Sequence, residues 1–241
     1  EPGLLTQAES GPGSFYQVIS HQLMVISATS TSGFALIAIA VGLLRFWRHC
    51  ELDPIRPREV ISAIKDVAQM TYLGGDEQEG CNDVSDSFSN QRRYYHQSLM
   101  WGFLMCFAST CVATYYDYVL RLEAPYDYLS FPVLLGTFGG LAMLVGCVGL
   151  FIIKWRSDPN PRASIQLGLD YAFILMLFLS SATGLILMIL RETQLMPILL
   201  AIHLAVVLSL FIMLPYSKFV HAGYRFISLI KYAQETHNGQ Q

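Results

Sequence analysis

The chain has 241 residues, of which 53% are hydrophobic and only 14% charged. Because charged residues make up about 25% of an ordinary soluble domain, this composition excludes a soluble globular protein and indicates a membrane protein. The net charge of −3 does not suggest a nucleic-acid partner, and we expect none. The five cysteines show neither a CxxC pair nor zinc-finger spacing, which argues against an iron–sulfur cluster or a disulfide framework.

Apolar segments follow a polar N-terminal stretch that we interpret as a flexible extramembrane tail over residues 1–17. Each segment is long enough to cross about 30 Å of hydrocarbon as an α-helix. We therefore predict an all-α fold, an integral membrane bundle of five transmembrane helices within residues 18–241. The predicted spans cover residues 18–46, 94–120, 129–153, 169–190 and 195 to about 230.

The last predicted span is longer than the bilayer and contains Pro215. We expect it to protrude from the membrane as one helix that bends at this proline. The sizeable extramembrane piece, residues 47–93, contains the stretch PREVISAIKDVAQMTYL, which predicts a surface helix over residues 57–73. An acidic, glycine-rich loop with Cys81 follows it, and its glycines match no phosphate-binding fingerprint.

Basic residues give the expected orientation in the membrane. Thirteen of the fifteen Lys and Arg residues lie in or beside the 47–93 segment, after the third span, or late in the fifth; only Arg121 and Arg191 lie at the opposite end. An excess of basic residues marks the cytoplasmic side of a membrane protein. We therefore predict that the 47–93 loop and the C-terminus are cytoplasmic and that the N-terminal tail lies outside.

Four histidines lie inside or at the edge of a predicted span, where an unpartnered imidazole is costly. In the fifth span, His203 and His221 are eighteen residues apart, which is five helical turns, so they are expected on one face about 27 Å apart. His21 opens the first span and His96 opens the second. Depth in the membrane therefore pairs His21 with His203 outside, the outer pair, and His96 with His221 inside, the inner pair.

Two facing imidazoles are the axial ligands of a six-coordinate haem b, so we predict two haems, with the inner one better supported. The inner pair has basic residues nearby to meet haem propionates: Arg92, Arg93, Lys218 and Arg225. Small residues such as Gly102 would let helices approach a macrocycle. The alternative interpretation is that these histidines only hydrogen-bond to Ser or Thr or sit at the interface, and His21 could instead help to bind a quinone.

Other polar residues leave two interpretations open. Five tyrosines crowd the outer ends of the second and third spans, where an interfacial aromatic belt is the expected explanation and a quinone pocket the sharper one. Asp117 and Asp170 lie near span ends and could relay protons or cap helices.

Three long motifs resemble the membrane half of the tricarballylate/citrate utilization protein B family. They are MTYLGG…GCN…FSNQRRYYHQSLMWGFLMCFASTCVAT, APYDYLSFPVLLGTFGG and HLAVVLSLFIMLPYSKFVHAGYRF. More distantly, five spans with histidines eighteen apart on the last resemble the gamma subunit of respiratory nitrate reductase, a dihaem cytochrome b. In that subunit the second span supplies both partner ligands, whereas here Cys106 stands about where the outer one is expected, so His21 would have to substitute.

The resemblance implies an electron-transfer subunit of an oxidoreductase in the bacterial inner membrane, a multi-pass b-type cytochrome domain over residues 18–241. It would pass electrons between the quinone pool and a cytoplasmic flavoprotein dehydrogenase or iron–sulfur subunit of tricarballylate or citrate catabolism. The alternative is a haem-free transporter or accessory component for tricarboxylate uptake, which would be expected to carry mid-membrane charges and repeated halves. A membrane anchor without cofactor would leave the four histidines unexplained.

Overall fold

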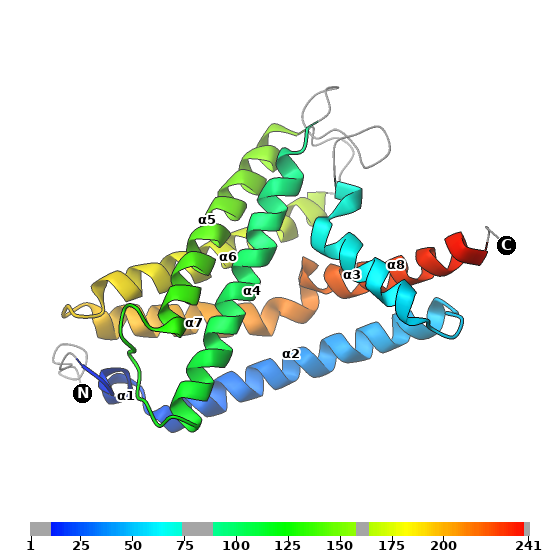
Figure 1. The fold of residues 1–241 in the computed structure, drawn as a ribbon. Helices are drawn as coiled ribbons and strands as arrows, with labels where there is room; N and C mark the ends of the chain where they lie inside the picture. Colours follow the sequence, from blue (N-terminus) through cyan, green and yellow to red (C-terminus); the bar gives the residue numbers. More distant parts are fainter. Residues whose placement is uncertain (1–10, 74–88, 158–163, 239–241) are drawn as a thin grey trace.

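The computed structural model describes residues 11–73, 89–157 and 164–238, and in these ranges it contains helices and no strand (Figure 1). The elements in chain order are α1 Ser14–Val18, α2 His21–His49, α3 Pro57–Gln69, η1 Thr71–Leu73, α4 Gln91–Tyr118, α5 Phe131–Arg156, α6 Ser164–Leu190, α7 Met196–Met213, η2 Leu214–Tyr216, η3 Lys218–Val220 and α8 His221–Asn238.

Five helices of the described chain are long and apolar enough to cross a membrane, namely α2, α4, α5, α6 from Gly168, and α7 continued to Tyr216. Each of them overlaps one of the five predicted spans, so the predicted all-α class is confirmed. The arrangement is compatible with a multi-pass membrane protein. The predicted surface helix is also present as α3, whereas most of the acidic loop that follows, including Cys81, lies outside the described residues.

Helices α4 and α5 touch through their backbones, because glycines leave no side chain between them. A Cβ added to Gly102 would stand 2.6 Å from the backbone nitrogen of Met143, and one added to Gly146 would stand 2.6 Å from that of Leu99. Ser98 closes the contact by donating its hydroxyl to the Ala142 carbonyl at 2.8 Å. Lipid does not drive apolar helices together, so this close backbone packing is what associates the pair.

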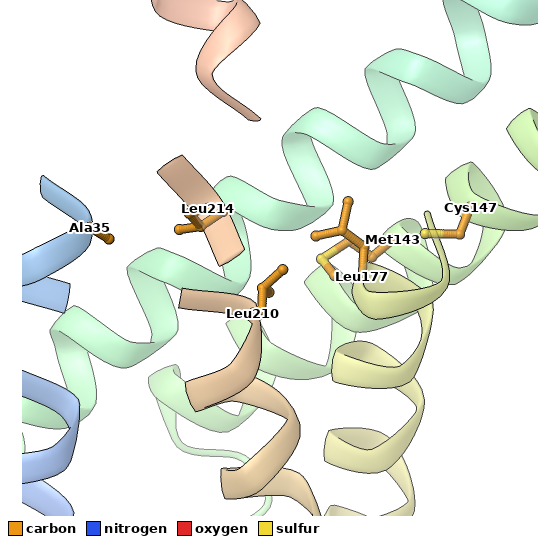
Figure 2. Packing of buried hydrophobic residues seen from close by; sticks show 6 residues of the cluster. All are labelled: Ala35, Met143, Cys147, Leu177, Leu210 and Leu214. Atoms are coloured by element: carbon orange, nitrogen blue, oxygen red, sulfur yellow. The ribbon is translucent and has the colours of Figure 1, made fainter. Parts of the chain in front are cut away.

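The central core joins these two helices to the rest of the bundle. Buried apolar side chains from α2, α5, α6, α7 and η2 meet there (Figure 2): Ala35, Met143, Cys147, Leu177, Leu210 and Leu214. A second contact fastens α7 to α6, where the ring of His203 lies against Gly184 so closely that an added Cβ would stand 2.9 Å from its Cε1 atom.

The predicted single helix over residues 195–230 is wrong. α7 ends at Met213, two 3-10 turns follow, and α8 begins at His221. Pro215 lies in the first turn, and Ser217 between the turns is extended, with ψ 174°, and accepts a hydrogen bond from the Phe219 amide at 3.2 Å. His203 and His221 therefore belong to different helices, and the inference that five turns of one helix separate them no longer holds.

The predicted tail also needs correction in its described part. Residues 14–18 form α1, whose Phe15 and Val18 pack against the buried cluster of Met196 and Leu200. The amide of Gly13 donates to the Ala124 carbonyl at 2.8 Å. These contacts tie the segment before the first span to the loop that follows α4; residues 1–10 lie outside the described residues.

Helix α3 is fastened to α8 at its N-terminal end. The Gln234 side chain, 2% exposed, donates to the Asp53 carbonyl at 3.0 Å and to the Glu59 carboxylate at 3.2 Å, and accepts from the Asp53 amide at 3.2 Å. Glu59 also accepts from the Arg56 amide at 2.9 Å, and this backbone hydrogen bond is the main reason why the pKa of Glu59 is lowered.

The glycine contact between α4 and α5 predicts that one added methyl group destabilises the protein at Gly146 but not at Gly33. Gly146→Ala should destabilise the protein by about 1–3 kcal/mol, because the two backbones must move apart. Gly33→Ala is the matched control, since nothing lies within 4 Å of a Cβ at Gly33, and it should be neutral or gain up to about 1 kcal/mol of helix propensity. Thermal unfolding of both purified variants in detergent measures the difference, and equal midpoints would contradict the packing described above.

Candidate functional site

The structure brings the inner pair together. His96 lies in the second turn of α4, His221 is the first residue of α8, and their ring centroids are 6.0 Å apart with the ring planes at 82°. Phe219, two residues earlier, packs on Phe103 of α4 with centroids 5.2 Å apart. Since His96 and Phe103 are seven residues apart, two turns of α4 present both rings to the segment that starts α8.

The two imidazoles differ in how their other nitrogens are satisfied. His221 Nδ1 is hydrogen-bonded to the Lys218 carbonyl in its own turn. If that nitrogen carries the proton, as a donor to a carbonyl must, Nε2 is left as an electron-pair donor. The Nδ1 atom of His96 is buried and has no hydrogen-bond partner among the described residues. A buried polar atom left unpaired is costly, so this nitrogen is available to a ligand.

Ion pairs fix the connection that carries His221. Asp170 of α6, 7% exposed, pairs through its two carboxylate oxygens with Lys154 of α5 and Lys218 of η3. The break between α7 and α8 is therefore attached to two neighbouring helices. The sequence left Asp170 as a proton relay or a helix cap; the structure gives it the role of joining three segments.

The basic residues predicted around the inner pair have different surroundings. Arg92 and Arg225 both lie within electrostatic range of His96. Arg93 donates from Nε to the Gln69 carbonyl at 2.9 Å, and Lys218 is engaged with Asp170. Gly102, predicted to make room for a macrocycle, instead touches the backbone of α5, so the space it leaves is already filled by a helix.

The structure gives the members of the outer pair separate partners. His21 Nε2 lies 2.7 Å from Oδ2 of Asp117, and His203 Nδ1 lies 3.0 Å from the Thr183 hydroxyl. No contact among the described residues joins His21 to His203, and their predicted pairing on a haem stays a prediction. Cys106, at the place expected for an outer ligand, has its sulfur 4.0 Å from the Gly136 carbonyl of α5.

Around Asp117 the structure builds a cluster that the sequence did not predict as a unit. Tyr16 of α1 donates its hydroxyl to Oδ1 of Asp117 at 3.1 Å, while His21 occupies the other oxygen. Burial, with the Asp117 charge as the next cause, raises the pKa of Tyr16, and the same two causes raise that of Tyr126 to about 12. Hydropathy alone does not predict this contact of Tyr16, because the residue lies in the polar stretch that was interpreted as a flexible tail.

No group of three or more His, Cys, Asp or Glu side chains in the described ranges could hold a metal ion by itself. A haem iron needs only two protein ligands, because the porphyrin supplies the other four.

Arg191, which the sequence placed on the outer side, is buried against the loop after α4. There it contacts the Tyr126 carbonyl, and its guanidinium carbon lies 3.7 Å from the centroid of the Tyr128 ring.

Comparison with known proteins assigns the chain to a family. The family model of citrate utilization protein B matches residues 1–240. The chain belongs to this family. It is 42% identical over 231 residues to citrate utilization protein B of Escherichia coli, an alignment that covers 95% of this chain and 60% of that relative. The family resemblance predicted from the sequence motifs is thus confirmed, while the chain spans less than two thirds of that relative's length. No solved structure matches it.

The ion network at the start of α6 predicts that loss of the shared carboxylate costs more than loss of its exposed lysine. Asp170→Asn should destabilise the protein by about 3–5 kcal/mol, because the largely buried Lys154 loses its counter-charge. Lys218→Ala should cost less, since the Lys218 side chain is 58% exposed and the Lys154 pair survives. Unfolding in detergent, with the exposed Glu192→Gln as control, ranks the three variants. A larger loss for Lys218→Ala than for Asp170→Asn would refute the assignment.

Proposed function

We propose that this chain is a membrane-anchored b-type cytochrome that passes electrons between a partner dehydrogenase and membrane quinone during the utilization of citrate or a related tricarboxylate. The observation that carries the proposal is that His96 of α4 and His221 of α8 face each other, with their ring centroids 6.0 Å apart. The family supports the metabolic context, because the chain belongs to the citrate utilization protein B family and is similar to its Escherichia coli member.

The separation of the two rings fits one metal between them. One ring nitrogen of each imidazole at about 2.0 Å from a shared metal would put the ring centres about 6 Å apart, and the two centroids are 6.0 Å apart. The Lys218 carbonyl on His221 Nδ1 is the kind of outer contact that orients a ligating imidazole. A haem b held by these histidines would supply reversible one-electron transfer.

Charge around the inner pair supports an anionic cofactor. Arg92 and Arg225 are the candidates to meet the haem propionates, because both act electrostatically on His96. Arg93 remains a further candidate beside them. Lys218 serves less directly than the sequence suggested, since its ammonium neutralises Asp170 while its carbonyl holds His221.

The proposal contains one haem at the inner pair. A second haem on the outer pair would require His21 to leave Asp117 and His203 to leave Thr183, and it stays a prediction from the sequence. The concentration of basic residues near the inner pair favours the cytoplasmic side for this end of the bundle. A flavoprotein or iron–sulfur partner would then deliver or receive electrons there, at the surface where Arg93 and Gln97 of α4 bond to the Gln69 carbonyl at the end of α3.

The haem assignment predicts the visible spectrum of the purified chain. The reduced-minus-oxidised difference should show a b-type α-band, and pyridine haemochrome quantification should give at least one haem per chain. His96→Ala and His221→Ala should each abolish the inner haem, because each removes an axial ligand. His49→Ala is the matched control, as His49 is exposed at the end of α2, and it should keep the full haem content.

Two results would overturn the proposal. One is the absence of a b-type α-band from the intact chain expressed with haem supplied, which would favour the transport alternative. The other is a haem content in His96→Ala and His221→Ala equal to that of His49→Ala, which would remove the inner pair as ligands.

A further inference from the structure

Helix α3 carries apolar side chains on two faces, and the bundle covers one of them. On the covered face, Ala63 is fully buried and packs with Leu229 and Ile230 of α8. On the other face, Ile61 and Ile64 are 65% and 54% exposed. Residues three apart are neighbours on a helix surface, so the two isoleucines form one continuous apolar patch, which we call the α3 patch. The described residues leave this patch uncovered.

The exposed charges of α3 are basic. Arg58 and Lys65 are both exposed, and they border the α3 patch, because one precedes Ile61 by three residues and the other follows it by four. The acidic side chains of the helix have other partners. Glu59 is buried against α8, and Asp66 accepts a hydrogen bond from the hydroxyl of the threonine that begins η1, at 3.1 Å. The outward side of α3 thus suits a ligand that combines apolar chains with negative charge.

Contacts at both ends hold α3 across the ends of two spans. Figure 1 shows α3 beside α8, between the C-terminal end of α2 and the N-terminal end of α4. Toward its N-terminal end, Glu59 accepts from the Gln234 side chain of α8 at 3.2 Å. At its C-terminal end, the Gln69 carbonyl accepts from Arg93 Nε and Gln97 Nε2 of α4 at 2.9 and 3.1 Å. The helix is therefore fixed where α2 and α4 reach the membrane surface.

Exposed aromatic side chains mark the membrane interface at the same level. Trp47 lies near the end of α2, Tyr94 in the first turn of α4 and Tyr232 in α8, and all three are exposed. Tyr and Trp gather where hydrocarbon meets the head groups, because their rings are apolar at one end and polar at the other. Tyr232 also meets Tyr72, in the turn directly after α3, with ring centroids 5.9 Å apart. The outward side of α3 thus lies at the level of the lipid head groups.

We propose that α3 lies in the plane of the membrane interface and binds anionic phospholipid. Ile61 and Ile64 enter the boundary between head groups and acyl chains, and Arg58 and Lys65 contact the lipid phosphates. An apolar face bordered by basic residues is how an amphipathic helix binds a lipid surface. The position of α3 favours lipid over a second protein, because α2 and α4 bring the bilayer to both ends of this helix. The haem assignment plays no part in this site.

Photo-crosslinking of the full chain in lipid nanodiscs tests whether the α3 patch contacts lipid. The photoreactive residue p-benzoylphenylalanine replaces Ile61, Ile64 or Ser62 in turn, in discs of equal parts phosphatidylcholine and phosphatidylglycerol, and mass spectrometry measures the lipid adducts. Ser62 is the matched control, since it is exposed on the same helix but lies on the side of Arg58 and Lys65. The probe at Ile61 or Ile64 should give at least about fivefold more lipid adduct than the probe at Ser62.

The composition of the adducts tests the role of the basic residues. At Ile61, phosphatidylglycerol should exceed phosphatidylcholine about threefold or more, because each nearby Lys or Arg favours an anionic lipid. Arg58→Gln combined with Lys65→Gln should abolish this enrichment. Arg121→Gln combined with Arg156→Gln removes the same charge at exposed positions outside α3, and this control should keep the enrichment.

Three results would overturn the proposal. Lipid adducts as rare at Ile61 and Ile64 as at Ser62 would mean that the α3 patch faces water. Equal amounts of the two lipids at Ile61, or an enrichment that survives the loss of both basic residues, would remove the contact with anionic head groups. In isolated cell membranes, adducts of the patch with a second protein in place of lipid would make it a protein-docking surface. Should the probe at Ile61 prevent folding, the probe at Ile64 decides. None of these measurements depends on haem, so this proposal and the cytochrome proposal fail or stand separately.

Discussion

The attachment of the broken fifth span to its neighbours is the constraint on which the inner site depends. Pro215 and the extended Ser217 interrupt the helix after α7. An interruption alone does not fix the direction in which the next helix, α8, runs. Asp170 restricts that freedom by holding Lys218, together with Lys154, at the start of α6. Once Lys218 is fixed, its carbonyl is fixed too, and the imidazole of His221 is oriented by that carbonyl.

Helix α4 supplies the other half of the site, because one of its sides packs on α5 and another contacts the segment that starts α8. One side carries Ser98, Gly102 and Cys106, and it lies so close to α5 that no side chain separates the backbones. Another carries His96 and Phe103, which contact His221 and Phe219. Close packing with α5 thus leaves His96 available to α8. Both sets of contacts are made within the chain and need no cofactor.

Hydropathy and charge were sufficient to predict the five spans, because a helix must satisfy its backbone hydrogen bonds wherever it crosses lipid. The same information predicted the inner pair by depth, since His96 and His221 both lie next to basic clusters. The route to that prediction was partly wrong: a continuous fifth helix was expected, and the structure breaks it. The break depends on tertiary contacts of Lys218 and on the Ser217 cap, which no local pattern specifies.

The outer end shows a different failure of sequence reasoning. Tyr16 stands in a short segment between a glycine-rich stretch and the first span, and its helix is only five residues long. A helix of that length is stable through tertiary packing and not through its own propensity. Asp117 was recognised as a polar residue at a span end, but its two partners come from a segment about a hundred positions earlier in the chain.

The contact made by Gln234 joins α3 to the same helix that carries His221. Gln234 bonds to Asp53 and Glu59 near the C-terminal end of α8, and His221 is the first residue of that helix. One end of α8 is thus attached to the segment between the first two spans, and the other end contacts α4 through the His96 and His221 rings. A single helix of eighteen residues therefore connects α3 to the inner pair.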